Sequence, residues 1–489
     1  MKDYDCVIIG GGISGLYILN NLKKYNFKNV LLLERSPFTG GKIKTLYNEQ
    51  NEVILEKGPW RFHNSHKRVL NLLKNLKLEF KQNTSSQQEA VKYNFDICKK
   101  KSVKLKKKII KKSGLSYKDS ITAISGKCKA NYLESFSKLP LIMDSTSKPY
   151  DVNLNYKGDY YIVKKGLQSI TENLYELNKN NIITNCLVKD IKNTSGRIYR
   201  IYYQKREKNN YTNHEINAKY IFLCLPPDYT KSWDIIDKNL QPLIHSVDTL
   251  ELHHIYGKYK NINNIYNNKF YINTNSELSQ IISGDFNNDW FQISYSSGEN
   301  AKYWNRIKLE NPNYFKKILQ KSIDNINLKI NIEEIKSFYW DKAIHYWKPI
   351  YKLNVKKEML KSIYPHPVNL PNLFWCGEAF SSIQGWIEGA LETSDIALNK
   401  FNNLLSNVKI FKHIYLKPNQ EYMIIDNRYI DIKEWKKIHP GSYSAIQNHL
   451  FEDISHLFRQ INHSEYSWSI INSLQKYWYY NNRIYKLML

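Results

Sequence analysis

Residues 3–35 alternate between apolar runs and one amphipathic segment. Two short apolar runs, at 6–9 and 30–33, flank a cluster of glycines and a stretch whose apolar residues recur at helical spacing. Short apolar runs bounded by turn residues are typical of buried strands, and helical spacing is typical of a helix packed on them. The pattern predicts a strand, a glycine turn, an amphipathic helix and a second, parallel strand.

The turn between the first strand and the helix has the spacing G-x-G-x-x-G. Gly10 makes the tight turn, Gly12 lets the backbone approach a pyrophosphate, and Gly15 lets the helix pack closely on the strand. Glu34 ends the second strand, where a carboxylate can accept hydrogen bonds from an adenosine ribose. A glycine turn alone can simply connect two elements, but here all four features agree. The dinucleotide contacts predicted in this unit are Gly10, Gly12, Ile13, Ser14, Gly15, Glu34 and Arg35.

The chain has 489 residues, a formal net charge of +27 and 42% hydrophobic residues. Its length is enough for roughly two to four folded domains. The basic run at 99–112 is interpreted first as a solvated surface segment and second as a polyanion-binding patch. No nucleic-acid-binding motif accompanies the charge, so specific nucleic-acid binding is not expected.

The six cysteines are scattered along the chain, and three of them lie in apolar strand-like runs. Neither a disulfide framework nor a zinc site is therefore predicted. The first strand begins within a few residues of Met1, no signal-peptide pattern precedes it, and no apolar stretch reaches membrane-spanning length. These features predict a cytoplasmic protein.

A second pair of glycines follows the first unit at once, in SPFTGGKIKT at 36–45. Gly40 and Gly41 remove side chains beside the bound dinucleotide, and Lys42 can meet its phosphates. A Glu-Arg pair followed by Gly-Gly-Lys after such a unit resembles the flavin-containing amine oxidase family. The resemblance implies that the dinucleotide is FAD, and it adds Gly41 and Lys42 to the expected contacts.

The segment NLFWCGEAFSSIQGWIEGALETSDIAL, at 372–398, is similar to the place where that family returns to the flavin. The resemblance implies a helix whose N-terminal dipole faces the isoalloxazine. Trp386 would wall the substrate pocket, although a core tryptophan at a helix cap is the alternative. The FAD contacts expected in this segment are Gly377, Glu378, Gly385, Trp386 and Ile387.

Two middle segments extend the resemblance. Val188, in CLVKDI at 186–191, corresponds to the family residue that meets adenine through its backbone, and YIFLCLPP at 220–227 resembles a strand of the flavin domain. The resemblance covers nearly all of 1–402 and implies an α/β fold, with a Rossmann-like FAD-binding domain interleaved with an α+β substrate domain. Within a 1–405 oxidase region, FAD-binding segments are expected at about 1–65, 180–230 and 368–405.

The stretch LEKGPWRFHNSHKRVLNLL, at 55–73, gives the best substrate clue. It resembles the L-amino-acid oxidase branch, in which Gly58, Pro59 and Trp60 would pass under the flavin and Arg61 would hold the substrate carboxylate. A guanidinium suits this task because it donates two parallel, charge-assisted hydrogen bonds. Arg61 bound to a flavin phosphate or to a helix C-terminus is the alternative.

Two further comparisons with the family concern chemistry. His253 and His254 lie where many amine oxidases carry a lysine that holds a water near flavin N5. No cysteine lies in the stretch before Leu373 where monoamine oxidases attach FAD, so FAD is expected to bind non-covalently. The aromatics of WDKAIHYWKP, at 340–349, either wall the cavity or belong to an ordinary core.

A separate module is predicted for 413–489. Two short strands, EYMII and RYIDI, flank an Asp-Asn turn, and a His-Pro-Gly corner and two helices follow. This order resembles cytochrome b5, and the resemblance implies a small α+β domain that binds haem b. His439 and His463 would be the axial ligands of the haem iron.

Two features decide how well this module fits its family. The family has glycine at the positions of Ser442 and Asn462. The apolar residues that would line a haem slot are Ile446, Leu450, Ile454, Phe458 and Ile470. The alternative is a small α+β interaction domain in which both histidines have ordinary hydrogen-bond partners.

Together the motifs predict a FAD-dependent oxidoreductase that oxidises a small-molecule amine or amino acid by hydride transfer to flavin. Arg61 and Trp386 would contact the substrate, and the haem module would relay electrons to an electron-transfer partner. Two alternatives stay open. One is an oxygen-using amine or polyamine oxidase with an independent haem module, and the other is a non-catalytic scaffold that keeps both folds.

Overall fold

The computed structural model describes most of the chain. Outside the described residues lie nearly all of 84–158, the stretches 260–270, 283–289, 350–353, 407–410 and 417–419, and some single positions. The basic run at 99–112, Cys98 and Cys128 are therefore outside the described residues. The described cysteines, Cys6, Cys186, Cys224 and Cys376, are free and buried. Among the described helices, none is both long and apolar enough to cross a membrane.

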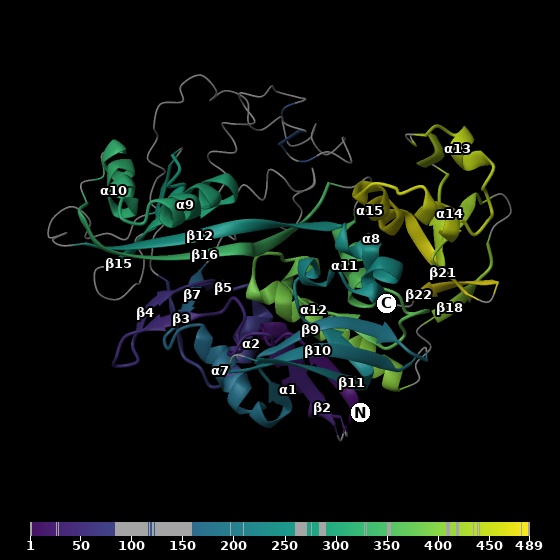
Figure 1. Cartoon of the computed structure of the whole chain (residues 1–489), viewed down its shortest axis with the longest axis horizontal. Helices are drawn as coiled ribbons and strands as arrows, with labels where there is room; N and C mark the ends of the chain where they lie inside the picture. Colours follow the sequence, from purple (N-terminus) through teal and green to yellow (C-terminus); the bar gives the residue numbers. More distant parts are fainter. Residues whose placement is uncertain are drawn as a thin grey trace.

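A seven-stranded sheet with a parallel centre forms the lower layer of the molecule (Figure 1). Its order is β8-β2-β1-β11-β10-β9, β17 pairs with β11, and β1 runs parallel to both β2 and β11. The strands are β1 (Lys2–Ile9), β2 (Val30–Leu33), β8 (Ile182–Ile183), β9 (Cys186–Asn193), β10 (Tyr199–Glu207), β11 (Asn210–Leu223) and β17 (Leu373–Trp375). The predicted α/β fold with a parallel core is confirmed.

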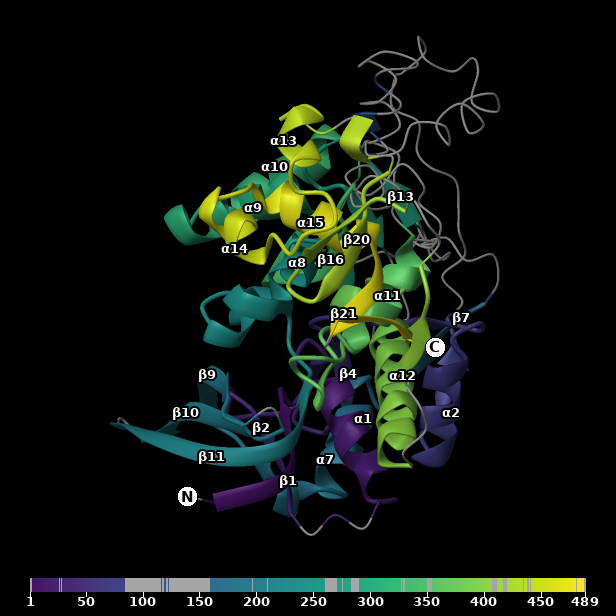
Figure 2. The same ribbon diagram turned by 90° about the vertical axis from the view of Figure 1, so that its right-hand side faces the viewer.

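Helices from both ends of the chain cover this sheet (Figure 2). Helix α1 (Ile13–Leu22) begins directly after the glycine turn, which confirms the strand, turn, helix and strand predicted for 3–35. It packs against α12 (Ile387–Leu405), with α7 (Gln168–Glu176) and α2 (Lys67–Asn75) alongside. Residues distant in sequence, such as Leu16, Phe222 and Leu391, therefore share one buried core.

A second, antiparallel sheet of five strands lies above the first (Figure 1). In spatial order its strands are β13 (Tyr271–Asn273), β14 (Gln280–Ile282), β15 (Trp290–Ser297), β12 (Val247–Tyr259) and β16 (Ile332–Trp347). Helices α9 (Gly298–Glu310) and α10 (Phe315–Asn325) pack on it through Trp304 and Leu319. The long strands β12 and β16 pair along most of their length, and β16 also contacts η4.

Short elements connect the two layers. The small sheets are β3 (Thr45–Tyr47) with β4 (Val53–Glu56), and β5 (Phe62–His63) with β7 (Tyr160–Val163) and β6 (Phe80–Gln82). The short helices are η1 (Lys179–Asn181), η2 (Pro227–Thr230), η3 (Ile236–Leu240), α8 (Gln241–Ile244), α11 (Val355–Ile363) and η4 (Glu378–Phe380).

The C-terminal module has its own five-stranded sheet and helices. The sheet order is β18 (Phe411–Ile414), β22 (Arg483–Leu487), β21 (Gln475–Tyr480), β20 (Arg428–Asp431) and β19 (Tyr422–Ile425). The helices are η5 (Trp435–Lys437), α13 (Ser444–Gln447), α14 (Ser455–Gln460) and α15 (Glu465–Leu474). The predicted strand, turn and strand are confirmed, and both turn residues, Asp426 and Asn427, have positive φ, as a tight hairpin turn requires.

The C-terminal module is joined to α11 and the chain that follows it by buried polar contacts, here called the module junction. Asn472 donates to Glu358 at 2.5 Å, and Lys361 bonds to both Glu358 and the carbonyl of Asn472. The His366 ring donates to the Asp426 carbonyl at 2.9 Å. Because unpaired buried polar groups are costly, these bonds hold the module in one orientation on the body.

Candidate dinucleotide site

A cavity of about 490 Å³ opens at the carboxyl ends of the parallel strands. Its walls include Gly10 after β1, Glu34 after β2, Cys224 after β11 and Gly377 after β17. In open α/β sheets ligands bind beyond these strand ends. The topology therefore brings four separate segments of the chain to one site.

The three motif glycines have different surroundings. A Cβ on Gly10 would lie 2.4 Å from the Cys224 carbonyl oxygen, and one on Gly15 would lie 1.9 Å from the Gly10 carbonyl oxygen, so both positions are closed by backbone. A Cβ on Gly12 would meet no atom within 4 Å. Gly12 is the residue directly before α1, where backbone N–H groups attract anions. This open cradle fits a pyrophosphate.

Glu34 is buried and lines the cavity. Its carboxylate accepts the N–H of Gly11 at 2.6 Å and the N–H of Ser36 at 2.8 Å. These bonds fix the carboxylate at the end of β2, and each of its oxygens can accept a further hydrogen bond from a ribose hydroxyl. Arg35 also lines the cavity, with its guanidinium 4.1 Å from the centre of the Tyr229 ring.

Nearly all the residues predicted to contact the dinucleotide line this cavity. They are Gly10, Gly12, Ile13, Ser14, Glu34, Arg35, Gly41, Lys42, Gly58, Pro59, Trp60, Val188, Gly377, Glu378, Gly385, Trp386 and Ile387. Gly15 is outside the lining and packs the helix on the strand, the role its motif position implies. Arg61 is also outside the lining.

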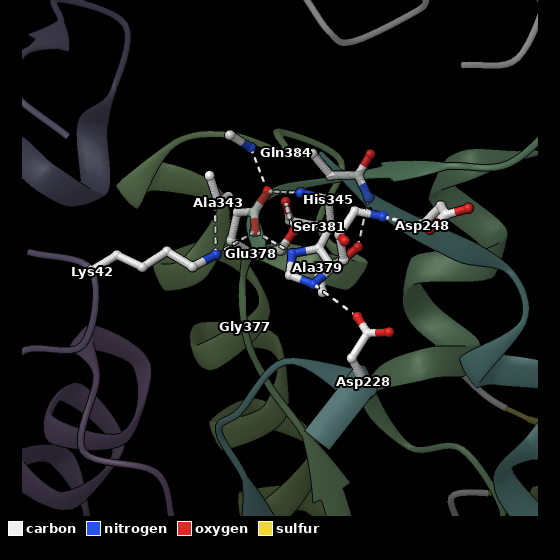
Figure 3. A network of polar contacts seen from close by, with 12 residues as sticks. Lys42, Asp228, Asp248, Ala343, His345, Gly377, Glu378, Ala379, Ser381 and Gln384 are labelled. Carbon is white, nitrogen blue, oxygen red and sulfur yellow. Dashed lines mark hydrogen bonds and ion pairs between the residues drawn. The ribbon is translucent and has the colours of Figure 1, made fainter. Parts of the chain in front are cut away.

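A polar network joins Lys42, the end of β16 and the segment that follows β17 (Figure 3). The Glu378 carboxylate accepts the N–H of Gly385 at 2.6 Å, the N–H of His345 at 3.1 Å and the Nδ1–H of His345 at 2.9 Å. Lys42 donates to the Ala343 carbonyl at 2.6 Å and lies 3.9 Å from Glu378. Burial alone would raise the pKa of Glu378, but His345, Lys42 and the Gly385 N–H outweigh it and lower that pKa to about 2.

Sequence reasoning missed His345 and Asp228, which lies on the other side of the imidazole. His345 stands within the aromatic stretch 340–349, and strand alternation shows only that it points to one face. It lies on β16, and its partners Asp228 and Glu378 lie on η2 and η4, so their meeting depends on the tertiary fold. A histidine on the buried face of a strand was the available signal.

Residues 13–112 match the family of flavin containing amine oxidoreductases. Among curated proteins, UDP-galactopyranose mutase from Mycoplasma genitalium is 30% identical over 74 residues, which are 15% of this chain and 18% of the mutase. The chain thus matches less than a fifth of that relative's length.

Solved structures of putrescine oxidase are similar over much more of the chain. A double mutant redesigned for cofactor binding has a TM-score of 0.57 at 14% identity, covering 82% of this chain and 99% of its own. The wild type bound to putrescine has a TM-score of 0.57 at 13% identity over the same shares. At such identity the likeness establishes the fold. The family match supports a flavin-dependent oxidoreductase, and neither comparison supports a haem domain.

The second sheet contributes Leu252, His254, Tyr295 and Trp340 to one wall of the cavity, and Trp60 and Trp386 also line it. His254 is buried, and its Nδ1 accepts the Gln292 amide at 3.1 Å, which leaves Nε2 for a molecule in the cavity. Burial and His253 lower the pKa of His254 to about 3, so this imidazole is neutral at ordinary pH. His253 is not part of the lining.

Trp386 and Arg61 both contact the ring of Tyr160. Trp386 is the N-cap residue of α12, and its ring stacks on Tyr160 at 6.3 Å while also lining the cavity. Trp386 therefore caps α12 and lines the cavity, and its role as a wall of a substrate pocket stays a prediction. The Arg61 guanidinium lies 4.2 Å from the Tyr160 ring centre and 4.7 Å from that of Trp60.

The predicted haem ligands lie on two loops of the C-terminal module. Ser442 and Asn462, where the family has glycine, have φ of 66° and 50°, so both adopt the left-handed conformation that glycine favours. Burial and the nearby His439 lower the pKa of His463. Both loops therefore contain a residue in a backbone conformation that a glycine adopts readily.

The space between these loops differs from a haem slot. Of the predicted lining residues, Ile446 and Phe458 are buried in a core with Met423 and Trp468, and Leu450 and Ile454 pack against it. The Phe458 ring stacks on His463 at 4.1 Å. His439 Nδ1 accepts the Gly441 N–H at 3.1 Å, whereas a ligating imidazole normally donates from its second nitrogen. The haem assignment stays a prediction.

Proposed function

We propose that the protein is a FAD-dependent oxidoreductase that oxidises an amine or amino acid by hydride transfer to flavin. The observation that carries this proposal is the convergence of the motif segments around 10–15, 34–42, 58–60, 188 and 377–387 on one cavity. The open space over Gly12 supports a dinucleotide, because a side chain there would fill it. The family match of residues 13–112 and the fold shared with putrescine oxidase support the flavin.

Each part of the cavity has a separate task in this proposal. The N-terminus of α1 holds the pyrophosphate, Glu34 the ribose, and Lys42 and the N-terminus of α12 the remaining FAD. FAD, when bound, supplies the acceptor for a hydride. The aromatic walls around Trp340 and Trp386 exclude water and orient the carbon that bears the amine, and neutral His254 offers a hydrogen bond without a charge.

Arg61 carries the finer proposal about the substrate. Its guanidinium is stacked on Trp60 and Tyr160, next to the cavity wall, where it would meet a carboxylate that extends past Trp60. Because stacking leaves the edge of the guanidinium free for bidentate bonding, amino acids are favoured over simple amines. The putrescine oxidase neighbour was solved with putrescine, so diamines are the competing class.

The test is anaerobic reduction of the purified flavoprotein by a panel of amino acids, amines and polyamines, followed as bleaching of the flavin absorption. We expect amino acids to bleach the flavin and Arg61→Lys to weaken them selectively. Reduction by polyamines alone would assign Arg61 another role, and no bleaching by any amine would favour the non-catalytic scaffold. Acid precipitation should release the yellow colour, because the FAD is expected to be non-covalent.

The electron acceptor is a second point of the proposal. The haem relay would use His439 and His463, and it is supported by the loop conformations and the element order of 413–489. The oxygen-using oxidase needs no haem. Mixing substrate-reduced protein with oxygen distinguishes them, because stoichiometric peroxide is expected only from the oxidase.

A further inference from the structure

His345 lies at the end of β16 between two carboxylates (Figure 3). Its side chain is only 1% exposed, its Nδ1 is 2.9 Å from Glu378 Oε2, and its Nε2 is 3.9 Å from Asp228 Oδ2. The backbone N–H of the same residue donates to Glu378 Oε1. One residue therefore holds both oxygens of the Glu378 carboxylate.

Glu378 in turn holds the turn that precedes α12. Its Oε1 also accepts the Gly385 N–H at 2.6 Å, and Gly385 has a φ of 81°. Trp386 follows directly and walls the cavity. The carboxylate therefore bonds the glycine that directly precedes this tryptophan and α12.

Other bonds join the same strand end to the 377–386 loop. Trp347 donates its N–H to Gln384 Oε1 at 3.1 Å and its ring N–H to the Ser381 carbonyl at 3.0 Å. These bonds place the loop as a whole, but they do not reach Gly385. The His345–Glu378 contact leads to Gly385, the residue directly before Trp386. The Trp386 ring also packs against the apolar cluster that contains Ala343 and Ile344 of the same strand.

We propose that His345 is a positioning residue for the FAD site: its Nδ1–H fixes the Glu378 carboxylate, which holds Gly385 and Trp386 against the cavity. This inference rests on the proposed function and deepens it. His345 acts through Glu378, and its ring contributes only the Nδ1–H donor to this task. The requirement is therefore for a donor at one position on the side chain.

That requirement can be tested with two amides. In His345→Asn the amide nitrogen takes nearly the place of Nδ1, whereas in His345→Gln it reaches toward the place of Nε2. We expect His345→Asn to bind FAD within about threefold of the wild type and His345→Gln to bind it at least tenfold more weakly, since one lost hydrogen bond to a charged group corresponds to such a factor. Titration of the deflavinated full chain with FAD, followed by flavin fluorescence, gives these affinities.

Controls separate positioning from general destabilisation. His366→Asn removes an equally buried imidazole at the module junction, outside the cavity lining, and should lower the melting temperature without changing FAD affinity. Glu378→Gln should weaken FAD binding in the wild type but add little in His345→Gln, because the two residues act as one unit.

A readout without FAD keeps the two proposals distinct. In the apoprotein, hydrogen exchange of the 377–386 peptides should be faster in His345→Gln and unchanged in His345→Asn. Equal exchange and equal FAD affinity in the two amide variants would overturn the role of His345. If wild-type protein binds no FAD, the proposed function fails, while hydrogen exchange still decides whether His345 positions the loop.

Discussion

The dinucleotide cavity and the C-terminal module are both predicted from paired motifs. In the structure the first contains open space, whereas the corresponding part of the second is packed with side chains. At the cavity, several segments that are distant in sequence meet around open space, and a Cβ on Gly12 would meet no atom within 4 Å. In the module, His439 and His463 lie on neighbouring loops, while the apolar residues expected around a ligand pack on each other. A motif indicates which residues meet; only packing shows whether room is left between them.

The two regions also differ in what holds their polar groups. Around the cavity, Glu34 and Glu378 are fixed by backbone N–H groups and still border the open space. In the module, His439 bonds to its own loop and His463 is covered on one face by Phe458. Preorganised polar groups beside a cavity favour a ligand site, whereas satisfied groups against a closed core favour a structural role.

The strongest test of this comparison is at the first glycine turn. Gly12→Val should abolish FAD retention through gel filtration, because the side chain would enter the pyrophosphate cradle, while the apoprotein keeps its melting temperature. Gly15→Val is the matched control, since its side chain would collide with the Gly10 carbonyl and should prevent folding. Flavin retention by Gly12→Val would show that the cradle is not the pyrophosphate site.

These two glycines also illustrate which features could be predicted from the sequence and which could not. The spacing of Gly10, Gly12 and Gly15 predicts a strand, turn and helix because local sterics decide it, and the family resemblance supplied most of the other cavity residues. His345 and Asp228 were not predicted because their contacts join a strand to short helices that are far apart in sequence. The module junction was not predicted for the same reason. The apolar core between the two histidine loops was not predicted because it depends on how side chains pack.

A second test asks whether the C-terminal module unfolds together with the main body. Lys361→Met removes the cation beside buried Glu358 and a donor to the Asn472 carbonyl, so we expect unfolding to become easier by about 3 kcal/mol. Lys302→Met, at an exposed ion pair with Glu299, should cost less than about 1 kcal/mol. Urea unfolding of the full chain measures both, and a module that unfolds separately from the body would contradict the junction.

The third test uses the pH dependence of stability at Glu56, a buried carboxyl of the main body. Burial raises the pKa of Glu56 to about 8, against the Leu167 N–H and Thr45 hydroxyl that bond to it. The unfolded chain releases this proton near its ordinary pKa of about 4. The folded state therefore binds more protons in between, and stability should fall as pH rises from about 4 to 8, by at most about 1.4 kcal/mol per pH unit.

Glu56→Gln copies the protonated carboxyl and should remove this slope. We expect the variant to match the wild type near pH 5 and to exceed its free energy of unfolding near pH 8. Urea unfolding at a series of pH values gives both curves. Parallel curves for the two proteins would mean that Glu56 does not retain its proton in the folded state.

The smallest expected effect concerns haem in the C-terminal module. Iron ligation requires His439 Nδ1 to release the Gly441 N–H and requires Phe458 to move from the ring of His463, so we expect haem added to the full chain to bind weakly. A low-spin Soret band should appear with excess haem, disappear after desalting, and be absent in both His439→Ala and His463→Ala.

His449→Ala is the control, because this exposed imidazole pairs with Glu452. A band that survives desalting would show that the loops open readily to a resident cofactor. No band at any haem concentration would contradict the haem assignment and leave 413–489 as a domain that serves the body through its junction.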